Sequence, residues 1–230
     1  MLKLSNINGF YGRSHALQDV DLTIPAGKVT AILGRNGMGK TTLLRTLMGS
    51  MVRSTGAIEL EGVRIDGLPT HLRARSGIAY VPQGREIIAD FSVRQNILMG
   101  AFAGRGPRAI PPLALELFPY LAANLHRPGG VLSGGQQQQL ALARALAAHP
   151  KVMLLDEPNE GIQPSVVEEI ESAITRLNRE FGMTMVLVEQ NIDFARRVAS
   201  HFAMFEKGSI VESGPIDRLT NEVVDGHMTF

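Results

Sequence analysis

Three segments that lie far apart in the chain contain residues suited to holding phosphate groups and a metal ion. They are residues 34–41, 132–136 and 152–157, which read GRNGMGKT, LSGGQ and VMLLDE. The first two are rich in glycine, and glycine-rich loops present backbone N–H groups to anions. The third is an apolar run that ends in two carboxylates, which suit hard cations such as Mg²⁺. Together the three segments predict chemistry on a nucleoside triphosphate.

Residues 34–41 fit the phosphate-loop pattern G-x-x-x-x-G-K-[ST] in a suitable context. They follow an apolar, β-leaning run at Val29–Leu33 and precede a helical pattern over residues 41–48. Lys40 is expected to reach the β- and γ-phosphates, and the Thr41 hydroxyl to bind Mg²⁺. The alternative is a chance glycine-rich turn, which the strand–loop–helix context disfavours. The candidate nucleotide-binding residues of this loop are Asn36, Gly37, Gly39, Lys40, Thr41 and Thr42.

The acidic segment places two carboxylates at the end of an expected buried strand, Val152–Asp156. In α/β sheets, ligands bind at the carboxyl ends of the strands, so Asp156 can hold the same Mg²⁺ ion as Thr41. Glu157 is then free to orient or polarise an attacking water. The alternative is that the two charges merely end a strand. Phosphoryl transfer depends mostly on positioning and charge stabilisation, so the general-base role of Glu157 stays open.

The middle segment predicts a second anion-binding helix start. Ser133 is a candidate N-cap, and Gly134 and Gly135 expose backbone N–H groups ahead of a helical pattern over residues 136–148. On these features alone, a simple helix cap with a polar face remains an alternative. Two phosphate sites of one chain serve the same nucleotide only if they meet. A sandwich of two chains would let each LSGGQ segment face the other chain's phosphate loop.

Length and composition fit one large domain, or a core with an inserted subdomain. The chain has 230 residues, of which 44% are hydrophobic, and a formal net charge of +1. Basic and acidic residues are nearly equal in number, and the sequence has no long basic run. The charge distribution therefore does not point to a nucleic-acid ligand. The absence of cysteine excludes disulfides and thiolate metal sites. No stretch reaches the roughly 18–20 apolar residues of a membrane span, and the start has no signal-peptide pattern, so we expect a cytoplasmic chain.

Strand and helix signals alternate along the chain, and the later strands are continuously apolar. This pattern predicts a mostly parallel α/β core, while the early strands, separated by Gly and Pro turns, predict an antiparallel side sheet. Between residues 85 and 131 the strand signal disappears, and we expect a helical subdomain inserted into a single domain 1–230. The expected strands are 2–7, 20–24, 29–33, 57–60, 78–81, 152–156, 183–189, 201–205 and 209–212. The expected helices are 41–48, 68–75, 93–99, 136–148, 164–181 and 192–199.

With these motifs in this order, the chain resembles the ATP-binding subunit of an ABC transporter over essentially its whole length. The LSGGQ pentapeptide, downstream of the phosphate loop and just before Asp156 and Glu157, carries the resemblance. The resemblance implies ATP and Mg²⁺ as cofactors. It also implies that Tyr11 stacks on adenine and that Gln83 links Mg²⁺ and water to the helical subdomain. The residues implied to contact the nucleotide of an opposite chain are Ser133, Gly134, Gly135 and Gln136.

Finer features resemble the second ATPase subunit of urea-type ABC importers. They are residues 80–87, 134–140 and 157–165, which read YVPQGREI, GGQQQQL and EPNEGIQPS. The branched-chain amino acid importer ATPase is a close relative with heavily overlapping motifs, and it is the alternative. By this resemblance the transported solute, urea or a similar small polar molecule, never touches the chain.

Two positions depart from the general ABC pattern. Gln190 stands where most members of the family carry a histidine, and Gln163 stands at the usual D-loop aspartate. An amide can donate a hydrogen bond to a γ-phosphate oxygen but cannot carry a proton's charge. We therefore hypothesise that the chain pairs with a different ATP-binding subunit, with a homodimer as the alternative. The candidate catalytic residues are Glu157, Gln190 and Gln83, and the candidate Mg²⁺ ligands are Thr41, Gln83 and Asp156.

The sequence as a whole predicts an α/β P-loop NTPase of ABC type that binds and hydrolyses ATP to move transmembrane permease subunits. The permease is expected to dock near residues 83–90, on the inner face of the cell membrane, with a periplasmic-type solute-binding protein involved indirectly. An ABC ATPase that acts as a mechanical clamp usually has a long coiled-coil insertion or tandem cassettes, and neither is visible here. A small-molecule kinase would leave the LSGGQ segment unexplained.

Overall fold

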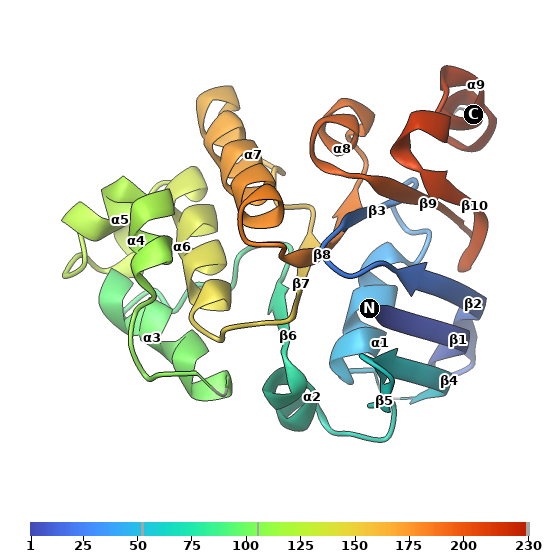
Figure 1. Cartoon of the computed structure of the whole chain (residues 1–230), viewed down its shortest axis with the longest axis horizontal. Coiled ribbons are helices and arrows are strands. Elements are labelled where there is room, and N and C mark those ends of the chain that lie inside the picture. The colour runs from blue at the N-terminus through green and yellow to red at the C-terminus, as the bar shows by residue number, and fades with distance from the viewer. Residues whose placement is uncertain (52, 105, 229–230) are drawn as a thin grey trace.

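A six-stranded sheet forms the centre of the computed structural model, which describes residues 1–51, 53–104 and 106–228 (Figure 1). Its strands, in spatial order, are β10 (Ser209–Pro215), β9 (His201–Glu206), β3 (Val29–Leu33), β8 (Thr184–Glu189), β7 (Val152–Asp156) and β6 (Ile78–Val81). Neighbours from β9 to β6 are parallel, whereas the edge strand β10 pairs antiparallel with β9. The predicted α/β fold with a mostly parallel core is confirmed.

A second, antiparallel sheet lies beside this core, as the sequence predicts. Its order is β2 (Ser14–Ile24), β1 (Leu2–Tyr11), β4 (Arg53–Leu60) and β5 (Val63–Arg64). The strands β1 and β2 run several residues further toward each other than expected, up to the pair formed by Tyr11 and Ser14. Most residues of their added ends are partly or fully exposed, with Gly9 and Leu17 buried, so the apolar pattern that marks a strand fades there.

Each predicted helix is present, with ends that agree with the prediction or differ from it by up to four residues. The α-helices are α1 (Lys40–Met48), α2 (Thr70–Ser76), α3 (Val93–Ala103), α4 (Pro112–Leu117), α5 (Pro119–Ala123), α6 (Gly134–Leu146), α7 (Pro164–Arg179), α8 (Ile192–Val198) and α9 (Asn221–Met228). Short 3-10 helices are formed by η1 (Gly129–Val131) and η2 (Ile216–Arg218). Within the described ranges, none of the helices has the length and apolarity that a membrane span requires. Residues 52, 105, 229 and 230 of the predicted domain 1–230 lie outside the described residues.

The central strands are buried on both faces, which explains why they are continuously apolar. In β7, Met153 and Leu155 pack into the core cluster that includes α6, α7 and α8, whereas Leu154 packs into the cluster that includes α1 and the antiparallel sheet. The helix α1 thus lies between the two sheets (Figure 1). Because β7 and β8 are held on both sides, the residues at their carboxyl ends have fixed places.

Helices α3, α4, α5 and α6 lie together on one side of the molecule, beyond β6 (Figure 1). Helices α3 and α6 approach each other closely at Gly100, where an added Cβ would come within 1.8 Å of the carbonyl oxygen of Arg144. The residues between 85 and 131 include α3, α4, α5 and η1. The LSGGQ segment lies at the start of α6, directly after these helices.

Candidate active site

The phosphate loop adopts a backbone that its glycines make possible. Gly37 has φ +77° and Gly39, which caps α1, has φ +107°. Residues with a side chain rarely adopt such positive φ values. A Cβ on Gly39 would also lie 3.0 Å from the carbonyl oxygen of Ala16. The loop therefore favours glycine at position 37 for its conformation, and at position 39 for both conformation and space.

This loop borders a cavity of about 580 Å³ that opens beside the antiparallel sheet. Every nucleotide-binding residue predicted from the phosphate loop lines it, and Tyr11, 43% exposed, reaches it from the end of β1. Gln83 and Glu157 contribute to the wall, although they lie far away in the sequence. The full lining is Tyr11, Ser14, His15, Ala16, Asn36, Gly37, Met38, Gly39, Lys40, Thr41, Thr42, Gln83, Glu157, Lys207 and Gly208.

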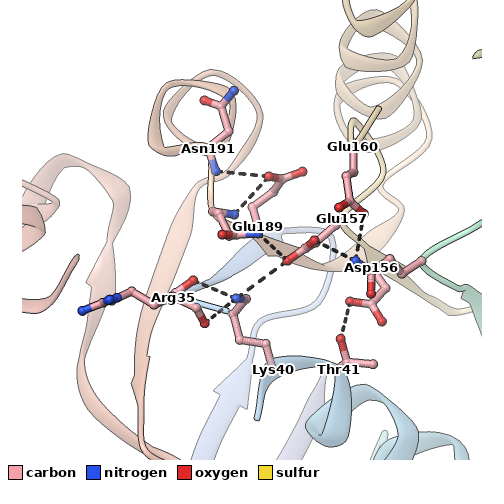
Figure 2. Close-up of polar contacts among 11 residues, drawn as sticks. Arg35, Lys40, Thr41, Asp156, Glu157, Glu160, Glu189 and Asn191 are labelled. Carbon is pink, nitrogen blue, oxygen red and sulfur yellow. Dashed lines mark hydrogen bonds and ion pairs between the residues drawn. The ribbon is translucent and has the colours of Figure 1, made fainter. Parts of the chain in front are cut away.

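Lys40 places a buried cation at the centre of this site (Figure 2). Its Nζ donates to the carbonyl oxygens of Gly34, at 2.7 Å, and Arg35, at 2.9 Å, and lies 3.8 Å from Oε1 of Glu157. Burial lowers the pKa of Lys40, while the charges of Glu157 and Asp156 oppose that shift. The ammonium is thus held by carbonyl groups that a phosphate oxygen can replace as a stronger, charge-assisted acceptor.

Asp156 lies at the end of β7 with both carboxylate oxygens engaged. Oδ1 accepts a hydrogen bond from the Thr41 hydroxyl at 3.0 Å, and Oδ2 accepts one from the Tyr80 hydroxyl at 2.9 Å. Burial raises the pKa of Asp156, and the bonds from Tyr80 and Thr41 oppose this rise. The contact between Thr41 and Asp156 brings two oxygen donors together, which is the ligand chemistry that Mg²⁺ prefers.

Glu157 follows at once in an unusual conformation, with φ +46°. Its N–H donates to the carbonyl oxygen of Val188 at 3.0 Å, which ties this turn to β8. The carboxylate is 8% exposed and accepts hydrogen bonds from Gln190 Nε2 on Oε1, at 3.0 Å, and from Gln83 Nε2 on Oε2, at 3.1 Å. The structure therefore brings the three candidate catalytic residues into one network, although they come from three loops.

Two further acidic residues belong to this network, and the sequence patterns did not reveal them (Figure 2). Oε2 of Glu160 accepts a hydrogen bond from Gln83 Nε2 at 2.8 Å. Glu189, 2% exposed at the end of β8, accepts backbone hydrogen bonds from Gln190 at 3.1 Å and Asn191 at 3.3 Å. Burial raises the pKa of Glu189 to about 7, although these two backbone bonds oppose the rise. The available signal was an acidic residue that ends a continuously apolar strand.

Tyr80 belongs to the motif at residues 80–87, but the sequence patterns assign it no role of its own. It lies on β6 opposite Leu154 of β7, two residues before Asp156. Pairing of β6 with β7 joins segments more than 70 residues apart, so no local pattern predicts the hydrogen bond between Tyr80 and Asp156.

The LSGGQ segment lies outside this cavity. Ser133 caps α6 as predicted: its hydroxyl accepts from the N–H of Gln136 at 3.4 Å, and the Gln136 side chain accepts from the N–H of Ser133 at 3.0 Å. This reciprocal pair is a capping box. Among the residues that line the cavity in the described chain, none comes from 133–136. The predicted cap is therefore confirmed, and within one chain the two glycine-rich segments do not line a common cavity.

Comparison with known proteins agrees with this geometry. Residues 17–160 match the family described as ABC transporter. The chain is 39% identical over 213 residues to a high-affinity branched-chain amino acid transport ATP-binding protein, BraG, of Pseudomonas aeruginosa, covering 92% of this chain and 91% of BraG. It is 35% identical over 221 residues to a probable branched-chain amino acid transport ATP-binding protein, LivF, of Archaeoglobus fulgidus, covering 95% of this chain and 94% of LivF.

The fold is also similar to that of solved ATP-binding cassettes. A dimeric post-hydrolysis structure of the cassette MJ0796, bound to ADP and Pi, superposes with a TM-score of 0.80 at 28% identity, covering 94% of this chain and 99% of MJ0796. Sequence family, relatives and fold agree with each other. The chain belongs to the ABC transporter family, as one of its ATPase subunits.

Proposed function

We propose that the chain binds ATP with Mg²⁺ in the 580 Å³ cavity and hydrolyses it to drive a solute importer. The observation that carries this proposal is the convergence of Lys40, Thr41 and Glu157 on one cavity. A phosphate-binding cation, a metal-binding hydroxyl and a water-orienting carboxylate are the parts that phosphoryl transfer from a nucleotide requires.

In this proposal the phosphate loop holds the phosphates and Tyr11 stacks on the adenine. Asn36, Gly37 and Gly39 present backbone N–H groups, with the Thr42 side chain beside them, and Lys40 exchanges its carbonyl partners for phosphate oxygens. The residues that would hold Mg²⁺ are Thr41, Asp156 and Gln83, all with oxygen atoms to offer. When bound, Mg²⁺ would offset the negative charge of the phosphates.

Glu157 is proposed to orient the water that attacks the γ-phosphorus and to accept its proton. The bond from the γ-phosphorus to the bridging oxygen then breaks, which leaves ADP and phosphate. Gln83 and Gln190 each donate an amide hydrogen bond to one oxygen of Glu157, so the two amides set the direction of its carboxylate. Because both partners are neutral, neither one neutralises the negative charge of Glu157.

A second ATP-binding chain is proposed to complete the site. Residues Ser133, Gly134, Gly135 and Gln136 stand at a helix start outside the chain's own cavity, where they can face the nucleotide of an opposite chain. The post-hydrolysis MJ0796 cassette is a dimer. The amides at Gln190 and Gln163 motivate a different ATP-binding subunit as the partner, with a second copy as the alternative. Equal hydrolysis rates at both sites of a purified complex would contradict an unlike partner.

The permease is proposed to dock in an apolar groove of about 310 Å³ between β6 and the helices α3 and α6. Pro82, Glu86, Met99 and Ala145 are among its lining residues, and Met99 is 42% exposed. The occupant would be a short apolar segment of a permease subunit, because the relatives are named as transport proteins. In this arrangement residues 85–131 act as a helical subdomain that moves with the permease, and the chain is held on the cytoplasmic face of the membrane.

The transported solute is proposed to be a small nitrogen-containing molecule, for which two candidates stand. The names of BraG and LivF favour branched-chain amino acids. The motifs at residues 80–87, 134–140 and 157–165 favour urea. A solute-binding protein outside the cell would choose between them, since the chain itself meets only the nucleotide and the other subunits.

Uptake of labelled urea and labelled leucine tests the proposal in cells whose only copy of the chain carries Glu157→Gln. Glu168→Gln is the matched control, because Glu168 is an exposed residue on α7 outside the cavity. Loss of urea uptake alone supports the urea importer, and loss of leucine uptake alone supports the amino acid importer. If Glu157→Gln and Glu168→Gln transport both solutes at the wild-type rate, the proposed role in their import is wrong.

A further inference from the structure

The strand β6 contributes one side chain, that of Tyr80, to the candidate metal site. This side chain belongs neither to the phosphate loop nor to the acidic segment. Tyr80 points its hydroxyl at Oδ2 of Asp156 over 2.9 Å, from the strand next to β7. Tyr80 is itself only partly exposed, and Asp156 is 1% exposed. A buried carboxylate that loses a hydrogen-bond donor carries a large desolvation penalty. The contact with Tyr80 therefore favours the orientation of Asp156 in which Oδ2 accepts this hydrogen bond.

The two carboxylate oxygens of Asp156 have different hydrogen-bond partners. One oxygen faces the proposed metal ligand Thr41, and the other accepts from Tyr80. Oδ1 faces Thr41, the residue with which Asp156 is proposed to share Mg²⁺. In the proposed function both oxygens would bind the cation, and the hydrogen bond between Thr41 and Oδ1 would then be given up. The bond from Tyr80 is made to Oδ2 and can persist. The bond from Tyr80 would therefore hold the carboxylate in one orientation with and without the cation.

The Tyr80 hydroxyl donates to Oδ2 of Asp156, and it also interacts with the guanidinium of Arg45, which can only donate. A phenol has an ordinary pKa of about 10 and is protonated at neutral pH. The hydroxyl thus keeps its proton and donates it to Oδ2 across the physiological pH range. A side chain beyond the direct ligands that orients a metal-binding carboxylate typically changes metal affinity by about 10- to 100-fold when it is removed.

We propose that Tyr80 is a positioning residue for Mg²⁺, because its hydroxyl fixes Asp156 so that Oδ1 faces the metal-binding oxygen of Thr41. This inference rests on the proposed function, in which Thr41 and Asp156 bind the cation that accompanies ATP. It assigns a metal-orienting role to a residue outside the phosphate loop and outside the acidic segment.

The test is to measure the affinity for a non-hydrolysable ATP analogue by calorimetry, once in excess Mg²⁺ and once in EDTA. The ratio of the two dissociation constants is the contribution of Mg²⁺ to binding. Tyr80→Phe removes the hydroxyl and keeps the ring, which also lines the 310 Å³ groove. Tyr120→Phe is the matched control, because its hydroxyl accepts a hydrogen bond from Arg127 among the helices α3 to α6, away from the cavity.

We expect Tyr80→Phe to lower the Mg²⁺ contribution about tenfold and to leave binding in EDTA unchanged, while Tyr120→Phe matches the wild-type protein in both conditions. An unchanged Mg²⁺ contribution in Tyr80→Phe overturns the role of Tyr80. An equal loss of affinity in both conditions also overturns it, since that result indicates general damage to the site. If Tyr80→Phe does not fold, Tyr80→Leu provides the same measurement with an apolar side chain and no donor.

The wild-type protein separates this inference from the function on which it rests. A clear Mg²⁺ contribution in the wild-type chain together with an unchanged contribution in Tyr80→Phe contradicts only the role of Tyr80. The absence of any Mg²⁺ contribution in the wild-type chain contradicts the metal site at Thr41 and Asp156, and the role of Tyr80 with it.

Discussion

The side-chain amide of Gln190 donates a hydrogen bond to Oε1 of Glu157 over 3.0 Å, joining the loops that follow β8 and β7. This hydrogen-bond partner of the candidate water-orienting carboxylate is a neutral group that cannot gain or lose a proton. Glu157 is held on its other oxygen by a second amide, that of Gln83. Two uncharged donors thus set the orientation of this carboxylate, and the ammonium of Lys40 forms an ion pair with Oε1 over 3.8 Å.

The first prediction concerns Gln190→Ala. Loss of one hydrogen bond to a buried carboxylate is worth about 1.5–3 kcal/mol, so we expect ATP turnover to fall about 10- to 100-fold. The affinity for ATP should stay close to that of the wild-type protein, because Gln190 does not line the cavity. Steady-state hydrolysis and calorimetric binding measure the two quantities separately. Wild-type turnover in Gln190→Ala would show that the amide does not orient Glu157.

The second prediction concerns Lys40→Ala. Lys40 is the buried cation of the cavity, and a pair of hydrogen bonds from a charged donor contributes about 3 kcal/mol or more, so we expect ATP affinity to fall about 100-fold. Lys151→Ala is the matched control, because Lys151 is 52% exposed and pairs with Glu61 on the surface. Calorimetric titration with ATP tests both variants. An ATP affinity of Lys40→Ala equal to that of Lys151→Ala would refute the phosphate-binding role.

The third prediction separates two neighbouring glycines of the LSGGQ segment. A Cβ on Gly135 would lie 2.6 Å from Cγ1 of Val166 on α7, whereas a Cβ on Gly134 would meet the flexible end of Arg85 at 3.0 Å. We expect Gly135→Ala to reduce the free energy of unfolding by about 1–3 kcal/mol, as overpacking usually does. Gly134→Ala should change it by less than about 1 kcal/mol. Urea denaturation of both variants provides the measurement, and equal stabilities would count against close packing of α6 on α7 at this point.

The fourth prediction concerns the pH dependence of stability. The pKa of Glu189 is about 7 in the folded chain, against an ordinary value of 4.5. Between these values the folded state binds more protons than the unfolded state, so the contribution of Glu189 to stability falls as the pH rises from about 4.5 to 7 and then stays constant. The total loss is about 3 kcal/mol, at about 1.4 kcal/mol for each pKa unit.

Glu189→Gln removes this titration and keeps an oxygen acceptor for the backbone N–H groups of Gln190 and Asn191. We expect the variant and the wild-type chain to unfold at similar denaturant concentrations at about pH 4.5, and the variant to be more stable at about pH 8 by up to about 3 kcal/mol. Denaturant unfolding at the two pH values provides the comparison. The same difference between variant and wild type at both pH values would place the titration of Glu189 outside this range.

Much of the fold could be predicted because its signals are local. The strands Val29–Leu33, Ile78–Val81 and Val152–Asp156 have their predicted limits, since each is a short apolar run that is buried on both faces. The helix α7 begins at Pro164 as predicted, because proline suits the first turn of a helix. By contrast, β5 is two exposed residues long and α9 has no fully buried side chain. Neither element has an apolar pattern strong enough to be recognised in the sequence.

The candidate site likewise combines features that local sequence predicts with contacts that depend on the tertiary structure. The sequence alone determined the phosphate loop, the acidic strand end and the capped start of α6, because each depends on neighbouring residues and their backbone preferences. Only the tertiary structure decided that Tyr80 meets Asp156, that Gln83 bridges Glu157 and Glu160, and that Glu189 is buried beneath Gln190 and Asn191. These contacts arise where parallel strands distant in sequence end at the same edge of a sheet, and the order of those strands is set by packing of the whole core.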